Sequence, residues 1–295
     1  MHVIAGATGN TGRPIIERLL SEGKQVRAIA RNAEHLKPLA AQGAEPFVGS
    51  LEDPDAMARA FTGAEAVYTL IPPNVTAPDF RAYQNRIGEA LATAIKKAGV
   101  SYVVNLSSIG AHLAEKVGPI KGLHDVEQRL NKLEGTHVLH LRPTFFMENL
   151  LMNIQMIKTM GIHGTPLKAD VALPMIATRD IAAEAAERLL RLDFKGKVVK
   201  ELLGPKEFTM AEITAILGKA IGKEPLPYVQ FPYDDAEKAM VGMGLSPDVA
   251  RGYIEMYRAF NDGILKPTER RSAKNTTPTS FEAFAREFAA IYKKS

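Results

Sequence analysis

Apolar residues recur along the first two thirds of the chain with two alternating spacings. Short apolar runs are separated by segments in which apolar side chains recur every three or four residues, as Ile15, Ile16, Leu19 and Leu20 do. The runs predict strands at 3–5, 25–31, 45–48, 66–71, 101–107, 137–141 and 197–203. The spaced segments predict helices at 13–23, 34–42, 53–61, 79–98 and about 123–133, and one that opens at Thr178. Strands that alternate with helices indicate a parallel sheet with helices on both faces.

The pattern changes after Arg142. The segment from Phe145 to Met160 predicts one helix, and beyond Gly204 helix caps outnumber strands. Capping boxes are predicted at Thr209 with Glu212 and at Thr279 with Glu282, and Asp180 is predicted to cap its own helix. The expected fold is α/β, a Rossmann-like doubly wound sheet formed by 1–145 and 171–203, with a smaller, mostly helical C-terminal lobe formed by 146–170 and 204–295.

The polar, basic segment 266–278 is predicted to be a solvated linker, with a mobile loop as the alternative.

Composition narrows the function classes. At 295 residues with 46% hydrophobic content, the chain can bury a large core. It has no cysteine, which excludes disulfides, thiolate nucleophiles and cysteine-ligated metals, so redox chemistry would need a bound cofactor. The net charge of +4 is spread among interspersed acids and bases, so a nucleic acid is not expected as a partner. No apolar run reaches the roughly 20 residues of a membrane span, and a cytoplasmic protein is expected.

A glycine-rich turn joins the first predicted strand to the first predicted helix. Gly6 permits a tight turn, Gly9 a close approach of the backbone to a ligand, and Gly12 the packing of helix on strand. The helix N-terminus then presents bare amides to a pyrophosphate. The predicted dinucleotide-binding residues of this turn are Gly6, Thr8, Gly9, Asn10, Thr11 and Gly12.

The end of the second strand indicates which dinucleotide binds. An acidic residue there holds the ribose hydroxyls of NAD, but this chain has Arg31, with Lys37 nearby. A guanidinium can pair with a 2′-phosphate, so NADP(H) is expected in preference to NAD(H). Ligands of such sheets lie across the carboxyl ends of the strands. The further cofactor residues predicted on this basis are Ile71, Pro72, Pro73, Ser107 and Ser108.

Four segments carry a resemblance to a known family: 6–12, 70–73, 105–108 and Arg142-Pro143-Thr144-Phe145-Phe146-Met147-Glu148-Asn149. Together they resemble the NmrA-like group of atypical short-chain dehydrogenases over nearly the whole chain. The resemblance implies an NADPH-dependent reductase that passes hydride to a planar, apolar acceptor such as a quinone or an azo or arylmethane dye. The alternative is a regulator that senses NADP(H) without turnover, and a homodimer or a protein partner is possible for either.

The Tyr-x-x-x-Lys pair of typical short-chain dehydrogenases is missing. His124 and Glu127 stand on the corresponding helix, one turn apart, and several NmrA-like reductases have such a pair with the histidine one residue earlier. The expectation is that His124 donates a proton or positions substrate and that Glu127 orients it; a capping histidine beside a surface glutamate is the alternative. Lys121 matches the lone lysine of isoflavone-reductase-like relatives.

Substrate contacts are expected from Phe145, Phe146, Asn149 and Tyr228. Met152, Met156 and Met160 recur every four residues, which suits a pocket for aromatic ligands but is typical also of ordinary helix core, the favoured interpretation. His137 and His140 are three apart on a strand and so face opposite sides, and no metal site is predicted.

Overall fold

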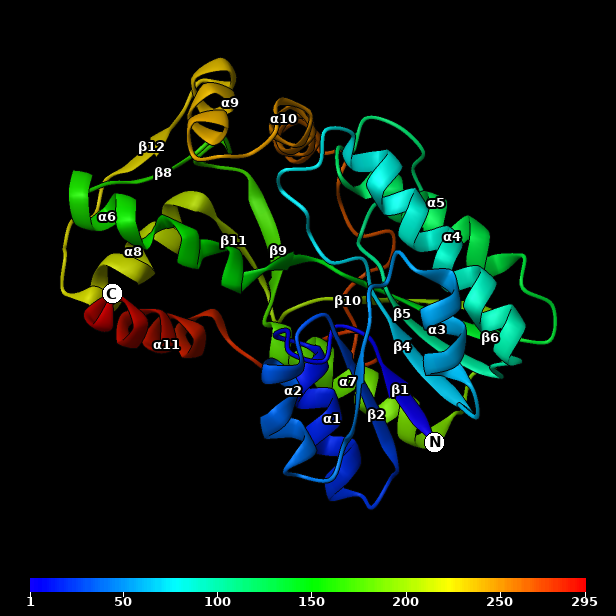
Figure 1. Cartoon of the computed structure of the whole chain (residues 1–295). Helices are drawn as coiled ribbons and strands as arrows, with labels where there is room; N and C mark the ends of the chain where they lie inside the picture. The colour runs from blue at the N-terminus through cyan, green and yellow to red at the C-terminus, as the bar shows by residue number, and fades with distance from the viewer.

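A computed structural model describes all 295 residues and shows a seven-stranded parallel sheet at the centre of the larger part of the molecule (Figure 1). Its order is β10-β6-β5-β4-β1-β2-β3. The chain adds β2 and β3 on one side of β1 and the other strands on the opposite side, so the order of strands reverses between β1 and β4. All seven predicted strands are confirmed, with ends within two residues of the prediction. They are β1 (His2–Ile4), β2 (Val26–Ala30), β3 (Glu45–Val48), β4 (Ala66–Thr69), β5 (Tyr102–Leu106), β6 (His137–Pro143) and β10 (Lys197–Leu202).

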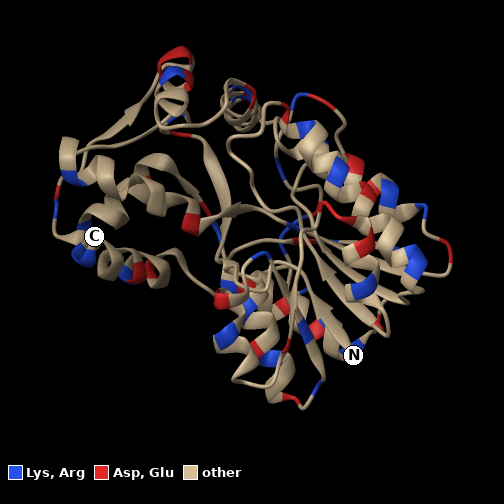
Figure 2. Ribbon diagram, in the orientation of Figure 1, with Lys and Arg blue, Asp and Glu red and all other residues tan.

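Helices cover both faces of this sheet, which confirms the Rossmann-like architecture. One apolar cluster packs the sheet against α1 (Gly12–Ser21), α2 (Ala33–Ala40) and α7 (Thr178–Arg191). A second cluster packs the opposite face against α3 (Pro54–Phe61), α4 (Phe80–Ala98) and α5 (Ile120–Asn131). Figure 2 shows basic and acidic side chains interspersed along the outer helices, α4 and α5 among them. No helix is long and apolar enough to cross a membrane.

The remaining elements gather on the other side of the carboxyl edge of the sheet, around a third apolar cluster (Figure 1). The helices are η1 (Met147–Asn153, 3-10), α6 (Ile154–Met160), α8 (Met210–Ile221), α9 (Tyr233–Gly242), α10 (Pro247–Asn261) and α11 (Phe281–Lys294). The strands are β7 (Phe145–Phe146), β8 (His163–Thr165), β9 (Ala172–Ile176), β11 (Glu207–Thr209) and β12 (Tyr228–Gln230). They form a three-stranded sheet, β11-β9-β7, and a two-stranded sheet, β12-β8.

The prediction of one helix from Phe145 to Met160 is wrong. Phe145 and Phe146 form β7, which pairs with Met175 and Ile176 of β9, and a 3-10 turn follows before α6 begins. The strand pairing is a long-range contact, which overrides the local helical spacing. The segment 171–203 therefore contributes β9 to the small sheet and β10 to the large one.

One predicted capping box is confirmed and the other is wrong. Thr209 and Glu212 cap each other at the start of α8. At α11 the cap is Ser280, which accepts from the Ala283 amide, while Thr279 is turned toward Asp180. Asp180 accepts from the Thr279 amide at 2.9 Å and its hydroxyl at 2.8 Å, so it ties α7 to α11 and does not cap its own helix.

The basic segment 266–278 is largely exposed, as predicted for a solvated linker, but it is also attached to the end of β10. Leu203 donates to the Asn275 carbonyl and accepts from the Thr277 amide, both at 2.7 Å. Buried Glu201 accepts from the amides of Thr268 and Glu269 at 2.9 and 3.0 Å. Local sequence could not predict this attachment, because the acceptors, Glu201 and Leu203, lie about 70 residues earlier in the chain. We call this segment the strap.

Two buried histidines are held in the neutral form. His140 Nδ1 lies 3.2 Å from the amide nitrogen of Asn105 and its Nε2 lies 3.0 Å from the Asn131 carbonyl oxygen, a pattern that fits a ring protonated on Nε2. His163 Nδ1 contacts the Thr214 hydroxyl at 2.6 Å, and its Nε2 has no partner. Burial lowers the pKa of each ring to about 4.

We expect the protein to lose stability as the pH falls from about 7 to 4. Each unfolded ring takes up a proton near pH 6.5, whereas the folded ring resists protonation until about pH 4, so acid favours unfolding. Each ring contributes up to about 3 kcal/mol to this loss. Urea unfolding from pH 7 to pH 4 measures it, with His140→Gln flattening the profile and His35→Gln, at an exposed position, leaving it unchanged. An unchanged profile in the His140 variant would contradict the assignment.

Candidate functional site

The glycine turn between β1 and α1 has no space for a side chain at Gly6 or at Gly12. Gly6 has φ +63°, and a Cβ there would lie 2.8 Å from Leu70. A Cβ at Gly12 would lie 2.2 Å from the Gly6 carbonyl oxygen, which no backbone adjustment short of moving the helix could relieve. The first turn of α1 is therefore pressed directly against the β1 turn. This close packing is the role predicted for Gly12.

The turn leaves a set of backbone donors without acceptors. Within it, Gly9 donates to the Gly6 carbonyl at 3.0 Å and Arg13 to the Gly9 carbonyl at 3.2 Å. The amides of Thr8, Asn10, Thr11 and Gly12 donate to no protein group. Thr8, Gly9 and Asn10 are exposed. Bare amides at the positive end of a helix suit an anion.

The Thr11 side chain is used inside the protein. The hydroxyl of Tyr68, a fully buried residue on β4, donates to Thr11 Oγ1 at 3.0 Å. Burial raises the pKa of Tyr68 well above its ordinary value, so the phenol keeps the proton that it donates. The bond holds the helix start over β4. Thr11 thus offers a ligand its amide, while its hydroxyl supports the turn.

Arg31 follows β2 at the same edge of the sheet. It is exposed, and no carboxylate lies within 4 Å of it. Tyr83 follows in the neighbouring helix α4. Burial and the charge of Glu52 raise the pKa of Tyr83, and the charges of Arg31 and Arg86 partly offset this. The Tyr83 hydroxyl donates to the Pro72 carbonyl at 3.1 Å. The loop that holds Ile71, Pro72 and Pro73 follows β4, which is two strands from β2, so this loop and Arg31 lie at the same carboxyl edge of the sheet.

Lys37 is engaged elsewhere. Its ammonium pairs with Glu34 at 2.6 Å, one turn earlier on α2, and both side chains are largely exposed. Arg31 thus has no acidic partner, whereas Lys37 is already paired with a carboxylate of its own helix.

A buried ion pair lies beneath the loop after β5. The Arg142 guanidinium donates to both oxygens of Glu127, at 2.9 and 2.5 Å, and Ser107 Oγ donates to Glu127 at 2.5 Å. Burial opposes the charge of Glu127, but the hydrogen bonds from Arg142 and Ser107 and the charge of Arg142 lower its pKa below the ordinary value. The Ser107 side chain therefore faces α5 and not the edge, while half-buried Ser108 accepts from the Ala111 amide at 3.1 Å.

This pair corrects the prediction that Glu127 orients His124. Both residues are on α5, but Glu127 is turned into the sheet, where a buried carboxylate requires a cation. His124 Nδ1 instead donates to the Ala111 carbonyl at 2.9 Å. Since a carbonyl only accepts, the proton is on Nδ1 in the neutral ring, and Nε2 has no protein partner.

Lys121 is one turn before His124 but is paired across the interface with α10. Its ammonium lies 2.9 Å from Glu255, and both residues line a polar cavity of about 340 Å³ between α4, α5 and α10. The contact places Lys121 in the attachment of α10 to the larger part of the molecule.

The predicted substrate residues separate into two groups. Phe145 and Phe146 on β7 and exposed Asn149 on η1 follow β6 at the carboxyl edge of the sheet. Phe145 packs edge-on against Phe260 at 5.9 Å between ring centroids. Tyr228 is part of the lobe structure, because its hydroxyl donates to the Leu167 carbonyl at 2.6 Å and contacts Thr165 at 2.7 Å. Burial raises the pKa of Tyr228 to about 12.

Met152 and Met160 are not core, contrary to the favoured interpretation, whereas Met156 is half-buried. Met152 is 78% exposed and Met160 is 63% exposed. The start of η1 carries a residue that sequence reasoning did not single out. Glu148 accepts from the Thr178 amide at 2.9 Å and hydroxyl at 2.6 Å, and so caps α7 from η1. The sequence signal that could have indicated a structural role for Glu148 is its place in the 142–149 motif, where Arg142 and Glu148 are the charged residues among apolar ones.

No group of three metal-ligating side chains is present. The larger of the two main cavities, about 680 Å³, lies along β10 and contains none of the predicted site residues.

Comparison with known proteins extends over nearly the whole chain. The sequence profile of the NmrA-like family matches residues 2–285. The NAD(P)H azoreductase of Xenophilus azovorans is 31% identical over 294 residues, which are 99% of this chain and 97% of that protein. The NADPH-dependent quinone oxidoreductase QOR2 of Escherichia coli, solved with NADPH, superposes with a TM-score of 0.82 at 24% identity over 100% and 99% of the two chains. The triphenylmethane reductase of a Citrobacter species, solved with NADP(H), has a TM-score of 0.81 at 20% identity over 98% and 100%.

We expect Gly12→Ala to lower the free energy of unfolding by about 3 kcal/mol, because the added methyl overlaps the Gly6 backbone. It should also abolish dinucleotide binding, since the amides of the turn are displaced. Chemical unfolding and calorimetric titration with NADPH measure the two effects. Gly242→Ala is the matched control: a Cβ there meets nothing within 4 Å, and stability should change by less than about 1 kcal/mol. Equal behaviour of the two variants would contradict the packing argument.

Proposed function

Because the chain belongs to the NmrA-like family, we propose that it is an NADPH-dependent oxidoreductase that transfers hydride to a planar, apolar acceptor such as a quinone, an azo dye or an arylmethane dye. The observation that carries the proposal is the glycine turn, which has four amides without an acceptor and follows β1 at the edge of the sheet where Arg31 follows the neighbouring β2. The relatives named azoreductase, quinone oxidoreductase and triphenylmethane reductase support the acceptor class.

The residues of the carboxyl edge fit a phosphorylated dinucleotide. Amides of Thr8, Asn10, Thr11 and Gly12 would hold the pyrophosphate at the helix N-terminus. Arg31, which has no competing carboxylate, would take the 2′-phosphate and favour NADP(H) over NAD(H). The loop 71–73 and the backbone of Ser107 and Ser108 would border the rest of the cofactor. When bound, NADPH supplies the hydride.

On the acceptor side the chain contributes orientation and one titratable group. Phe146 and Asn149 follow β6 and would border a flat acceptor, and His124 would exchange a proton through Nε2, since Nδ1 is committed to Ala111. Quinones and stabilised carbocations accept hydride without a strong acid acting in the same step. The missing tyrosine and lysine pair is therefore compatible with turnover of such acceptors.

The function is tested by following NADPH oxidation at 340 nm with menadione, an azo dye and a cationic triarylmethane dye. Steady turnover that depends on the acceptor and on enzyme concentration is the expected result. Tight NADPH binding with no turnover across the panel would overturn the reductase assignment and favour a regulator that senses NADP(H).

We expect Arg31→Ala to weaken NADPH binding by about 1.5–3 kcal/mol and NADH binding much less, because only NADPH carries the phosphate with which the guanidinium pairs. Calorimetric titration of both coenzymes measures the difference. Lys37→Ala is the matched control, with a smaller effect, because its ammonium is already paired with Glu34. Equal losses for NADPH and NADH in the Arg31 variant would remove the cofactor preference.

We expect His124→Gln to separate two kinds of acceptor. Menadione needs a proton after hydride, so its kcat should fall roughly 100-fold, whereas a triarylmethyl cation becomes a neutral product with hydride alone and should keep its kcat. His112→Gln, at an exposed position of the neighbouring loop, is the control. Equal losses with both acceptors would mean that His124 positions the loop through Ala111 and does not transfer a proton.

A further inference from the structure

Two tyrosines of α10, Tyr253 and Tyr257, have hydroxyl groups that make no hydrogen bond within the protein. Tyr228 differs, because its hydroxyl donates to the Leu167 carbonyl at 2.6 Å. The side chains of Tyr253 and Tyr257 are half-buried, and neither hydroxyl oxygen is closed off from the surface. A hydroxyl in such a place pairs with water or with a ligand.

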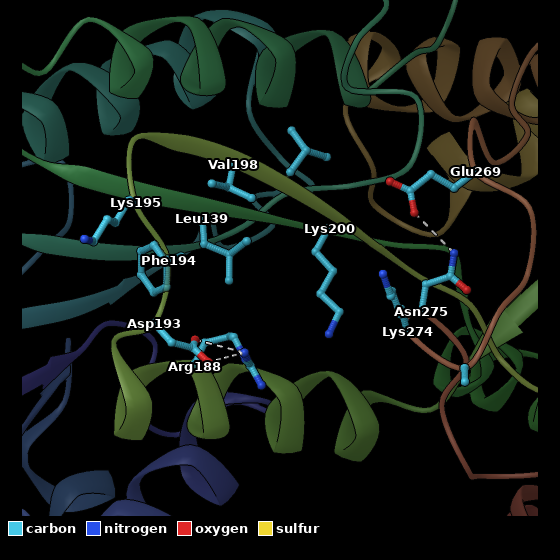
Figure 3. A pocket seen from close by; sticks show the side chains of 12 residues that line it. Leu139, Arg188, Asp193, Phe194, Lys195, Val198, Lys200, Glu269, Lys274 and Asn275 are labelled. Atoms are coloured by element: carbon cyan, nitrogen blue, oxygen red, sulfur yellow. Dashed lines mark hydrogen bonds and ion pairs between the residues drawn. The ribbon is translucent and has the colours of Figure 1, made fainter.

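Polar side chains that line a hollow are commonly bonded to one another, as two pairs in the cavity along β10 show (Figure 3). Arg188 donates to Asp193 at 2.9 Å, and the Asn275 amide group donates to Glu269 at 3.3 Å. The two hydroxyls of α10 have no such partner, so they are free to bind a ligand.

The helix that carries these tyrosines crosses the chain after β4, β5 and β6 in turn. At its start, the Ser246 amide donates to a carbonyl of the loop after β4 at 2.8 Å. In its middle, the Gly252 carbonyl is so close to Gly118, which follows β5, that a Cβ at Gly118 would lie 2.0 Å from it. At its end, Phe260 packs against Phe145, which follows β6. Figure 1 shows α10 between α9 and the start of α4.

This part of the sheet edge is where the acceptor belongs. Arg31 follows β2, on one side of β1, so a 2′-phosphate bound there directs the nicotinamide half of NADP(H) to the other side, toward β4 and β5. An acceptor must contact the nicotinamide to receive hydride, so it would lie beneath α10. His124, bound to the Ala111 carbonyl in the chain after β5, belongs to the same region.

The two tyrosines share one face of α10 with Phe260, because the three positions are four and three residues apart. Since Phe260 contacts Phe145, this face is turned toward the chain after β6. Tyr253 packs against the apolar cluster of α3, α4 and α5, whereas Tyr257 packs against the cluster of the lobe. The pair therefore stands where the larger part of the molecule meets the lobe.

Both phenols are hydrogen-bond donors at neutral pH. Burial raises the pKa of Tyr253, and it raises the pKa of Tyr257 to about 12, with a contribution from the neighbouring phenols Tyr253 and Tyr228. A carbonyl oxygen of a quinone gains negative charge when hydride arrives, and donors directed at that oxygen stabilise the charge. A triarylmethyl cation has no oxygen of this kind.

We propose that the hydroxyls of Tyr253 and Tyr257 donate to the carbonyl oxygens of the acceptor and so favour quinones among flat acceptors. The inference rests on the proposed function, because it takes the acceptor to lie beneath α10. Acceptors without a carbonyl oxygen would still bind through their flat rings, since hydroxyls that reach the surface can pair with water instead.

The test measures equilibrium binding to the full-length protein saturated with NADP⁺, which has no hydride to give, so turnover is not required. Equilibrium dialysis gives the Kd of menadione, which has carbonyl oxygens, and of a cationic triarylmethane dye, which has none. We expect the double variant Tyr253→Phe/Tyr257→Phe to bind menadione about tenfold more weakly than the wild-type protein does, as the loss of a hydrogen bond predicts. Its Kd for the dye should stay within about twofold of the wild-type value.

The control Tyr102→Phe/Tyr292→Phe removes two hydroxyls that likewise make no protein hydrogen bond, from half-buried tyrosines on β5 and α11. It should bind both ligands as the wild-type protein does. Thermal unfolding and the Kd of NADP⁺ verify that each variant is folded and that its coenzyme site is intact.

An unchanged menadione affinity in the Tyr253→Phe/Tyr257→Phe variant would overturn the inference, as would the absence of saturable menadione binding to the wild-type protein. Equal losses for menadione and the dye would also overturn it, since the tyrosines would then act through shape and not through their hydroxyls. Menadione binding that depends on the two hydroxyls, without any NADPH oxidation, would contradict the reductase assignment while supporting these contacts. The two failures are therefore distinguishable.

Discussion

The contact between the first turn of α1 and the β1 turn determines how the edge of the sheet is arranged. The absence of a Cβ at Gly12 lets the helix start against the Gly6 carbonyl, at a separation that no other residue type permits. The Tyr68 hydroxyl then holds Thr11 from below. With the helix start fixed, its unpaired amides are directed to one place, and the loops after the neighbouring strands, with Arg31 among them, surround that place.

A second set of interactions fixes α5 to the sheet. Glu127 is bound to Arg142 and Ser107, and Asn131 contacts His140, which reaches Asn105. Buried polar groups of this kind contribute little net free energy of folding compared with apolar packing. They do fix one arrangement, because leaving any member without its hydrogen-bond partner costs free energy. They set the position of α5 and therefore of His124. The carboxylate that sequence spacing assigned to chemistry thus stabilises the helix that carries the histidine.

The sequence predicted the large sheet well because its five inner strands are largely buried and its helices have one apolar face, so local spacing reports the fold directly. The cofactor turn was predictable because glycine spacing reflects local backbone geometry. The roles of Phe145 and Thr279 and the attachment of the strap were missed because each depends on a partner far along the chain: β9 for Phe145, Asp180 for Thr279 and Glu201 for the strap. The role of Glu127 was missed for the same reason, since helical spacing cannot show whether a carboxylate faces a neighbour on its helix or an arginine on a strand.

The cofactor side and the acceptor side of the proposed site differ in how strongly they discriminate between ligands. On the cofactor side, backbone donors and Arg31 provide directional, charged contacts, which discriminate strongly between ligands because a mismatch leaves polar groups unpaired. The chain that follows β6 offers Phe145, Phe146 and the exposed Met152, with Asn149 as the amide among them. Apolar contacts discriminate weakly between ligands of similar shape, and methionine adapts its conformation to different surfaces. A reductase built in this way would be selective for its coenzyme and permissive toward flat acceptors, so the acceptor is defined better by its shape and electrophilicity than by any one chemical group.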